Sequence, residues 1–161
     1  MSFYSPDSGY VSLAGAGYGR TFDGGKSWKI YTVRKGQDSA FEDICFVSGD
    51  TGIICGRFGM LYRTVDGCKM WESIWLPDND KTPWLTSVAL MHGGGGVMVG
   101  LKPGQPPTGV GYRTEDAGKT WSKIDVKGLA FGEIFYRPGE PICFQSWGRL
   151  NYSIDQGKTW G

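Results

Sequence analysis

Short segments of alternating apolar and polar residues cover most of the chain, and clusters of Gly, Pro and Asp separate them. A period of two residues is typical of half-buried β-strands. Within one stretch it predicts four consecutive strands, near residues 41–48, 52–57, 60–65 and 71–76. No segment shows the 3.6-residue period of an amphipathic helix, so the pattern predicts an all-β fold.

An eight-residue motif recurs four times: TFDGGKSW at 21–28, TVDGCKMW at 64–71, TEDAGKTW at 114–121 and SIDQGKTW at 153–160. The similarity extends upstream, where segments 3–23, 46–66 and 135–155 align without a gap. Successive copies of the motif Asp are 43, 50 and 39 residues apart, as expected for four-stranded propeller blades. We therefore expect one domain, 1–161, with blades at approximately 1–34, 41–77, 84–127 and 131–161.

Turn chemistry explains the residue types in the motif. An Asp at the start of a hairpin turn accepts hydrogen bonds from N–H groups two or three residues on, and the following Gly supplies a positive φ. The Trp then begins the outer strand and covers the turn. We expect a structural role, and no catalytic one, for Asp23, Trp28, Asp66, Trp71, Asp116, Trp121, Asp155 and Trp160. Cys68 and Met70 depart from the pattern, so the second corner should be looser.

The consensus S/T-x-D-x-G-x-T/S-W resembles the Asp-box, or BNR, repeat of sialidases and other β-propellers, including the photosystem II assembly and stability factors. Four copies cover nearly the whole chain. The resemblance implies a small β-propeller of four Asp-box blades. It implies no single function, because enzymes, lectin-like proteins and assembly factors share the repeat.

The last blade is expected to be incomplete, because one residue follows Trp160 where the earlier units continue into an outer strand. Three arrangements fit this pattern: a closed ring of four, which is favoured, two chains that share an eight-bladed ring, or a piece of a longer propeller. An unpaired strand edge invites another chain to pair with it. The expected partners therefore include a second copy of the chain or a larger assembly.

The two longest insertions, 77–84 and 102–109, connect strands on the rim opposite the Asp boxes, where binding loops are commonly carried. Short turns at 57–59 and 147–149 lie on the same rim. The expected binding surface is aromatic and basic and consists of Arg57, Phe58, Lys81, Trp84, Lys102, Trp147 and Arg149. Such residues suit protein anchors and sugar stacking equally, and in the alternative Phe58 and Trp147 only seal the ring.

Two further positions repeat with the motif. Arg20, Arg63 and Arg113 precede their boxes, with Tyr152 in the fourth copy, and we expect them to pair between blades. A Lys follows each motif Asp at the third position and should point into solvent.

Charge and composition narrow the function classes. Seventeen basic and sixteen acidic residues leave a net charge of +1, which favours neither a nucleic-acid nor a membrane partner. Four scattered Cys and a single His predict no disulfide framework, zinc site, cofactor or nucleophilic triad. The N-terminal residues lack the regions of a secretion signal, and no run of 18 apolar residues exists. A virion and the cytoplasm both stay open as locations.

A sialidase-like site would require three converging Arg, a Tyr and Glu pair and an Asp acid, and the sequence does not identify such a set. We therefore expect no enzymatic activity. The leading hypothesis is a structural or protein-interaction module, a rigid propeller that presents loops to protein partners. Asp-box propellers also occur among phage structural proteins, which suggests a virion component. The alternatives are a glycan-binding, lectin-like propeller and a fragment of a sialidase-like glycosidase.

Overall fold

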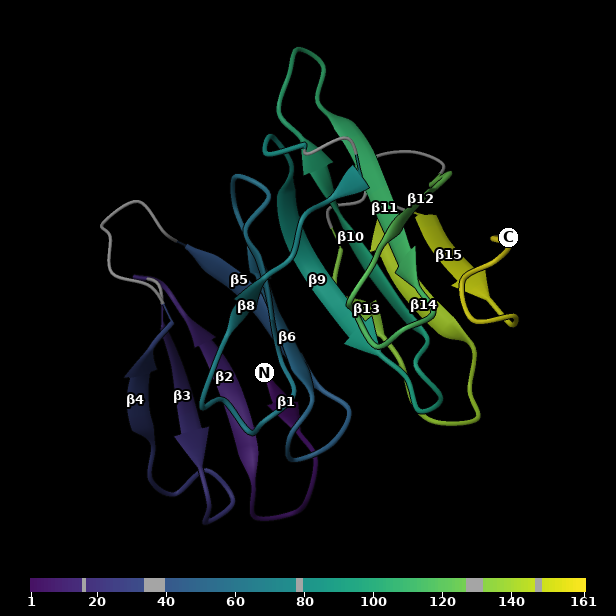
Figure 1. The fold of residues 1–161 in the computed structure, drawn as a ribbon. Coiled ribbons are helices and arrows are strands. Elements are labelled where there is room, and N and C mark those ends of the chain that lie inside the picture. The colour runs from purple at the N-terminus through teal and green to yellow at the C-terminus, as the bar shows by residue number, and fades with distance from the viewer. Residues whose placement is uncertain (16, 34–39, 78–79, 127–131, 147–148) are drawn as a thin grey trace.

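The computed structural model describes residues 1–161 except 16, 34–39, 78–79, 127–131 and 147–148. The described residues form fifteen β-strands in four antiparallel sheets, which follow one another along the chain (Figure 1). Within each sheet, neighbouring strands are also neighbours in the sequence. This is the blade arrangement of a propeller, and it confirms the all-β fold.

The strands of the first sheet are β1 (Ser2–Phe3), β2 (Gly9–Leu13), β3 (Gly17–Thr21) and β4 (Lys29–Thr32). Those of the second are β5 (Phe41–Phe46), β6 (Gly52–Gly56), β7 (Leu61–Thr64) and β8 (Glu72–Ser73). Those of the third are β9 (Trp84–Leu90), β10 (Gly96–Lys102), β11 (Thr108–Thr114) and β12 (Ser122–Ile124). Those of the fourth are β13 (Ile134–Phe135), β14 (Ile142–Ser146) and β15 (Arg149–Ser153).

The fourth sheet has three strands in the described part of the chain, which confirms an incomplete last blade. Gly161 lies beside β15, where its N–H donates to the Tyr152 carbonyl at 3.0 Å and its carbonyl accepts from the Tyr152 N–H at 3.2 Å. Residue 161 thus occupies the place where an outer strand begins.

The hairpin between the second and third strands of the fourth sheet is one residue shorter than those of the first and second sheets. Gly52 pairs with Thr64 across the second sheet, whereas Ile142 pairs with Ser153 across the fourth. The gap-free alignment of 135–155 with 46–66 is therefore wrong upstream of the turn, where it is displaced by one residue. Since side chains alternate between the two faces of a strand, the displacement exchanges the faces of every residue in β14.

Three apolar clusters fill the joints between successive sheets. The first joint is mostly aromatic, and the Tyr10 and Phe46 rings stack with centroids 3.7 Å apart. The second joint packs Ile53 and Leu61 against Met98 and Trp121. The third is built from the buried residues Ala89, Met91, Val97, Val99, Ile134, Ile142 and Phe144. Face-to-face packing of sheets through these clusters holds the blades together.

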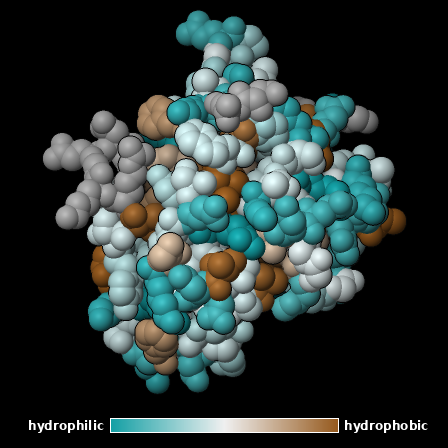
Figure 2. All heavy atoms as spheres, in the orientation of Figure 1, coloured by the Kyte–Doolittle hydropathy of each residue, from teal (hydrophilic) through white to brown (hydrophobic). Residues whose placement is uncertain are grey.

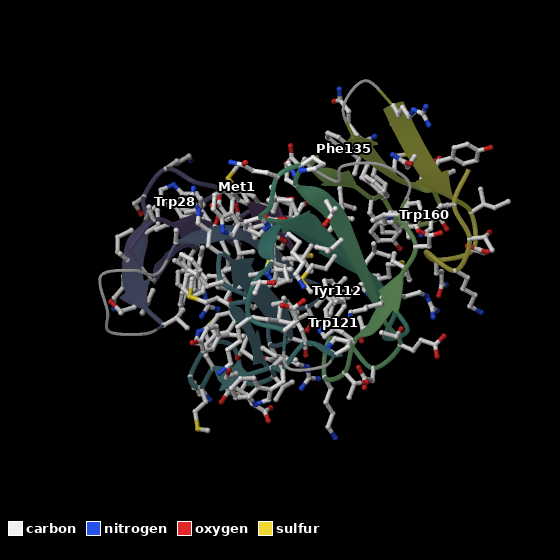
Figure 3. The ribbon with its side chains drawn as sticks, turned by 90° about the horizontal axis from the view of Figure 1, so that it is seen from above. Met1, Trp28, Tyr112, Trp121, Phe135 and Trp160 are labelled. Carbon is white, nitrogen blue, oxygen red and sulfur yellow. The ribbon has the colours of Figure 1, made fainter. Side chains whose placement is uncertain are left out.

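The four sheets form an open arc. In Figure 1 the first and fourth sheets lie at opposite ends, with β4 at one end and β15 at the other. Seen from above in Figure 3, Trp28 lies toward one end and Trp160 toward the other. Apolar side chains of the two end sheets are exposed to solvent, as in Ile30 (62 %) and Leu150 (65 %). The favoured closed ring of four is therefore not formed in this structure.

Each Asp box is closed by hydrogen bonds among its own residues. In the first box, Asp23 accepts from the Ser27 N–H at 2.9 Å and from the Ser27 hydroxyl at 2.5 Å. The Thr21 hydroxyl donates to Asp23 at 2.8 Å and accepts from the Gly25 N–H at 2.9 Å. In the first box these donors to the Asp lie four residues on, whereas in the fourth box the Lys158 N–H, three residues on as expected, also donates to Asp155 at 3.0 Å. The Thr hydroxyl is an acceptor that the motif analysis did not assign.

The boxes lie beside the turns between the first and second strands of their sheets. The Gly24 N–H donates to the Asp7 carbonyl at 2.9 Å, and the third box repeats this bond between Ala117 and Gly94 at 2.7 Å. Boxes and these turns therefore share one rim, as the blade geometry predicted. The Lys of each box is exposed on this rim.

The hydrogen bonds in the boxes favour ionised carboxylates. Bonds from Ser27, first from its hydroxyl and then from its N–H, lower the pKa of Asp23 to about 2. In the fourth box the N–H and hydroxyl of Thr159 hold the pKa of Asp155 well below its usual value. These Asp residues are thus acceptors for their own turn at neutral pH.

The motif Trp residues directly precede the outer strands β4, β8 and β12. The Trp28 indole N–H donates to the Gly25 carbonyl at 3.1 Å, and that of Trp121 to the Gly118 carbonyl at 3.1 Å. The indole nitrogens of Trp71 and Trp160 are buried without a hydrogen-bond partner among the described residues. The indoles of Trp28, Trp121 and Trp160 lie over the Gly of their turns, and among the described residues those of Trp28 and Trp121 are also hydrogen-bonded to the turn.

The second box departs from the others as its sequence predicted. Cys68 has φ 71°, a left-handed conformation that the corresponding Gly residues adopt without a Cβ penalty. Asp66 accepts from the Met70 N–H at 3.0 Å, but Met70 has no hydroxyl to supply a second bond. This corner therefore makes fewer hydrogen bonds than the other three.

An Arg side chain crosses each of the three joints between sheets. Arg20 donates to the Gly67 carbonyl at 3.4 Å, and Arg63 Nε donates to the Ala117 carbonyl at 2.8 Å. Across the third joint, Arg113 Nε donates to the carbonyl of residue 156 at 2.9 Å. The predicted pairing between blades is confirmed, and its acceptor is the carbonyl of the residue after the next motif Asp.

Candidate functional site

The rim opposite the Asp boxes is built by the loops of the second and third sheets. The turn between β6 and β7 packs on the connection from β8 to β9, because the Gly59 N–H donates to the Pro83 carbonyl at 2.8 Å. Phe58 and Gly59 both have positive φ, 58° and 64°, which turns the Phe58 ring outward to 57 % exposure. The connection from β10 to β11 projects above these loops at the top of Figure 1.

Arg57 lies at the centre of this rim. Its Nε donates to Glu42 Oε1 at 2.8 Å, and its guanidinium lies 5.0 Å from the centre of the Trp84 ring. The Arg57 side chain is 46 % exposed. A guanidinium held by a carboxylate and an aromatic ring is oriented, yet its remaining N–H groups stay accessible to a ligand.

The connection from β8 to β9 contributes a cation–π contact and one partner of an ion pair. Lys81 Nζ is 4.7 Å from the centre of the Trp75 ring, and the Trp75 side chain is 59 % exposed. Lys102 Nζ, from the end of β10, lies 3.0 Å from Asp80 Oδ2. Hydrogen bonds from Thr82, followed by that from Lys102, lower the pKa of Asp80 to about 2, so this ion pair is present at neutral pH.

Two shallow hollows flank Asp80. The first, about 150 Å³, lies between the turn at Phe58 and the exposed Trp75 ring. The second, about 260 Å³, lies beside Lys102 over β11 and β12. Asp80 lines both hollows, so they form one continuous surface across the second and third sheets. We call this surface the loop rim, and its residues are Arg57, Phe58, Trp75, Asp80, Lys81, Trp84 and Lys102.

The structure brings together five of the seven side chains predicted for this surface, namely Arg57, Phe58, Lys81, Trp84 and Lys102. Arg149 begins β15 and is exposed on the fourth sheet, outside both hollows. Trp147 lies outside the described residues.

The sequence analysis missed Trp75, Glu42 and Asp80. Trp75 lies between the buried Ile74 and Leu76, so a Trp occupies a solvent-facing position of the alternation. That mismatch was the available signal for Trp75. The sequence held no such signal for Glu42 or Asp80, because each joins the surface through a partner at least 15 residues away.

Other chemistry is not evident in the described residues. No group of three His, Cys, Asp or Glu side chains within them is placed to hold a metal ion. All four cysteines are free thiols, and burial raises the pKa of Cys45 to about 11. The described part of the chain has no helix long and apolar enough to cross a membrane. In Figure 2 hydrophilic residues cover most of the visible face, with separate hydrophobic residues among them.

A scan against protein families identifies residues 1–134 as matching the model of the photosynthesis system II assembly factor YCF48, a BNR-repeat family. The chain belongs to this family. The match covers the first three Asp boxes and the loop rim, and it confirms the resemblance inferred from the repeats. A search of curated proteins found no match.

Solved structures show the same fold at low sequence identity. YCF48 bound to a D1 peptide has a TM-score of 0.63 and 20 % identity, over 99 % of this chain and 64 % of the other. YCF48 from Cyanidioschyzon merolae has a TM-score of 0.69 and 18 % identity, over 100 % and 53 %. An ancestral GH74 enzyme has a TM-score of 0.66 and 16 % identity, over 94 % and 23 %. This chain therefore spans less than two thirds of each of these neighbours.

Proposed function

We propose that the chain is a non-enzymatic protein-interaction module that holds an extended peptide segment of its partner on the loop rim. The observation that carries the proposal is the gathering of exposed aromatic and cationic side chains at one rim of a rigid sheet scaffold. Trp and Arg are the residues most enriched in the energetic centres of protein interfaces. Membership of an assembly-factor family and a family neighbour bound to a peptide support the same function.

The chemistry of the rim indicates which peptides would bind. Arg57 and Lys102 are held by ion pairs at the surface, and the two cationic side chains are 46 % and 47 % exposed, so each can be shared with an incoming carboxylate. Exposed ion pairs contribute about 0–1 kcal/mol. Phe58 and Trp75 border the smaller hollow and offer ring surface to an apolar side chain. We therefore infer a partner segment that combines Asp or Glu with an aromatic or aliphatic anchor.

The ion pairs of the loop rim do not resemble those of a hydrolytic site. Arg57 is bound to Glu42 and Lys102 to Asp80, so two of its cations are bound to carboxylates of the protein itself. The similarity to a GH74 enzyme extends to the fold and carries no activity to this chain. A location in a virion or in the cytoplasm is not tested by any of these findings and stays a prediction.

A random peptide library provides the probe, because the partner is not identified. We expect selected peptides to be acidic with an apolar anchor, and Arg57→Ala or Trp75→Ala to weaken their binding about 10-fold to 100-fold by calorimetry. Lys69→Ala, on the opposite rim, is the matched control and should bind as the unchanged protein does. Peptides of no common chemistry, or equal binding by all variants, would refute the proposal. Binding on a glycan array without peptide binding would favour the lectin alternative.

A further inference from the structure

In each of the three joints, the earlier of the two sheets contacts the later one through residues at the same two positions. These positions are cross-strand neighbours, and they are Tyr10 with Arg20, Ile53 with Arg63 and Val97 with Arg113. The Arg donates to the carbonyl of the residue after the next motif Asp. The apolar residue of the pair packs on the residue two positions after the next motif Asp. In the second joint, for example, a Cβ on Gly118 would lie only 2.5 Å from Ile53 Cδ1.

The fourth sheet presents the same pair of positions to solvent. Cys143 and Tyr152 are cross-strand neighbours there, and Phe135 is the next neighbour of Cys143 on the same face. Phe135, Tyr152 and Leu150 are 57 %, 50 % and 65 % exposed. The Tyr152 hydroxyl is a hydrogen-bond donor in the register of the three Arg side chains. This face is therefore a joint surface without a following sheet in the described chain.

The first sheet presents the complementary half of a joint. Gly25 corresponds to Gly118 and Gly157, which are buried under the preceding sheet, whereas a Cβ on Gly25 would meet only Phe3 and Trp28 of its own sheet. The Phe3 ring packs edge-on against Trp28, and Phe3 and Ile30 are 42 % and 62 % exposed. This corner is ready to accept the face of a preceding sheet.

We propose that two copies of the chain join head to tail, the fourth sheet of each on the first sheet of the other, to close a ring of eight sheets. Two identical joints would then cover all four end faces, and eight blades lie within the usual range of propellers. Cys143 would pack on Gly25 of the second copy, and the Tyr152 hydroxyl would face the Gly24 carbonyl. The joint would continue the packing seen three times within the chain.

The two end faces favour a second copy as the occupant, because they carry complementary halves of one joint. The fourth sheet offers the Cys143 and Tyr152 positions and the first sheet offers the Gly25 corner, so one further copy covers both faces. A net charge of +1 also opposes self-association only weakly.

The mass of the 161-residue protein tests the proposal directly. Light scattering after size-exclusion chromatography, at protein concentrations of about 1–100 µM, should give a molecular mass twice the 17.7 kDa of one chain. Leu150→Glu and Ile30→Glu should each give the single-chain mass with unchanged circular dichroism, because both side chains are exposed in the isolated arc. Met70→Glu, at a 74 % exposed apolar position on the second box, is the matched control and should remain a dimer.

A single-chain mass for the unchanged protein, a ladder of larger masses, or a dimer that survives Leu150→Glu and Ile30→Glu would overturn the proposal. The loop rim lies on the second and third sheets, so Leu150→Glu should keep peptide binding. Dimerisation and the proposed function can therefore fail independently.

A cysteine cross-link tests the register of the joint. In Gly25→Cys, the new thiol should form a disulfide with Cys143 of the second copy when diamide is the oxidant, and Cys143→Ser in the same protein should abolish the linked dimer. A Cys is accommodated at the corresponding position of the second box, where Cys68 has φ 71°. Gly139→Cys, on an open turn of the fourth sheet, should not cross-link. Equal cross-linking of all three variants would contradict the proposed register.

Discussion

Replacing Thr114 with Val isolates the hydroxyl that closes the third Asp box. Thr114 is 2 % exposed, and its hydroxyl donates to Asp116 at 2.7 Å. The same oxygen accepts from the Gly118 N–H at 3.0 Å and from the Asp116 N–H at 3.3 Å. Val keeps the shape and the β-branch of Thr, so the change removes hydrogen bonds without opening a cavity.

The expected cost follows from the groups left without partners. The Gly118 N–H is buried, and an unpaired buried donor costs about 1–3 kcal/mol. With the lost bond to the Asp116 carboxylate, the free energy of unfolding should fall by about 2–4 kcal/mol. For a chain of this length that corresponds to a fall of about 5–15 °C in the thermal midpoint.

Urea unfolding followed by Trp fluorescence measures this change, at one protein concentration so that any association affects all variants equally. Thr114→Ser is the matched control, because it keeps the hydroxyl, as Ser153 does in the fourth box. It should lose about 1 kcal/mol or less. If Thr114→Val unfolds within about 0.5 kcal/mol of Thr114→Ser, the hydroxyl does not stabilise the corner and the account of the box is wrong.

Two further predictions concern the other boxes. Met70→Thr should raise the free energy of unfolding by about 0.5–1.5 kcal/mol, because the hydroxyl can donate to Asp66 as in the other three boxes, and an unchanged urea midpoint would contradict this. The pKa of Asp23 is lowered from 3.8 to about 2, so its contribution is present above about pH 4 and is lost as the pH falls through 2. Asp23→Asn should lower the thermal midpoint at pH 6 and reduce its further drop between pH 4 and pH 2, whereas an equal drop in both proteins would exclude this linkage.

The corner motifs and the strands could be predicted because their partners are close in sequence. All hydrogen bonds that close the first box join residues within Thr21–Trp28, so the residue types determine the turn whatever surrounds it. The same holds for the alternation in β5 to β8, whose predicted strands differ from the observed ones mainly at their ends. The role of the Thr hydroxyl was missed because the turn was assigned to the Asp alone.

The candidate site was predicted only in part, because its members meet through long-range contacts. Arg57 is oriented by Glu42 and Trp84, and the loops meet through a bond from Gly59 to Pro83. Blade geometry placed the loops on one rim but could not tell which side chains would pair. Trp147 stays a prediction, since it lies outside the described residues.

The sequence by itself determined the four Asp-box corners and the all-β blades, because each depends on hydrogen bonds or alternation within a few residues. The place of the Arg residues between blades could be predicted because the position repeats with the motif, although their acceptors lie 43 to 54 residues away. Only the tertiary structure decided that the sheets form an open arc, which face of β14 points outward and which side chains make the loop rim. Those features depend on how sheets stack and on a one-residue difference in a hairpin, and packing between residues distant in the sequence sets both.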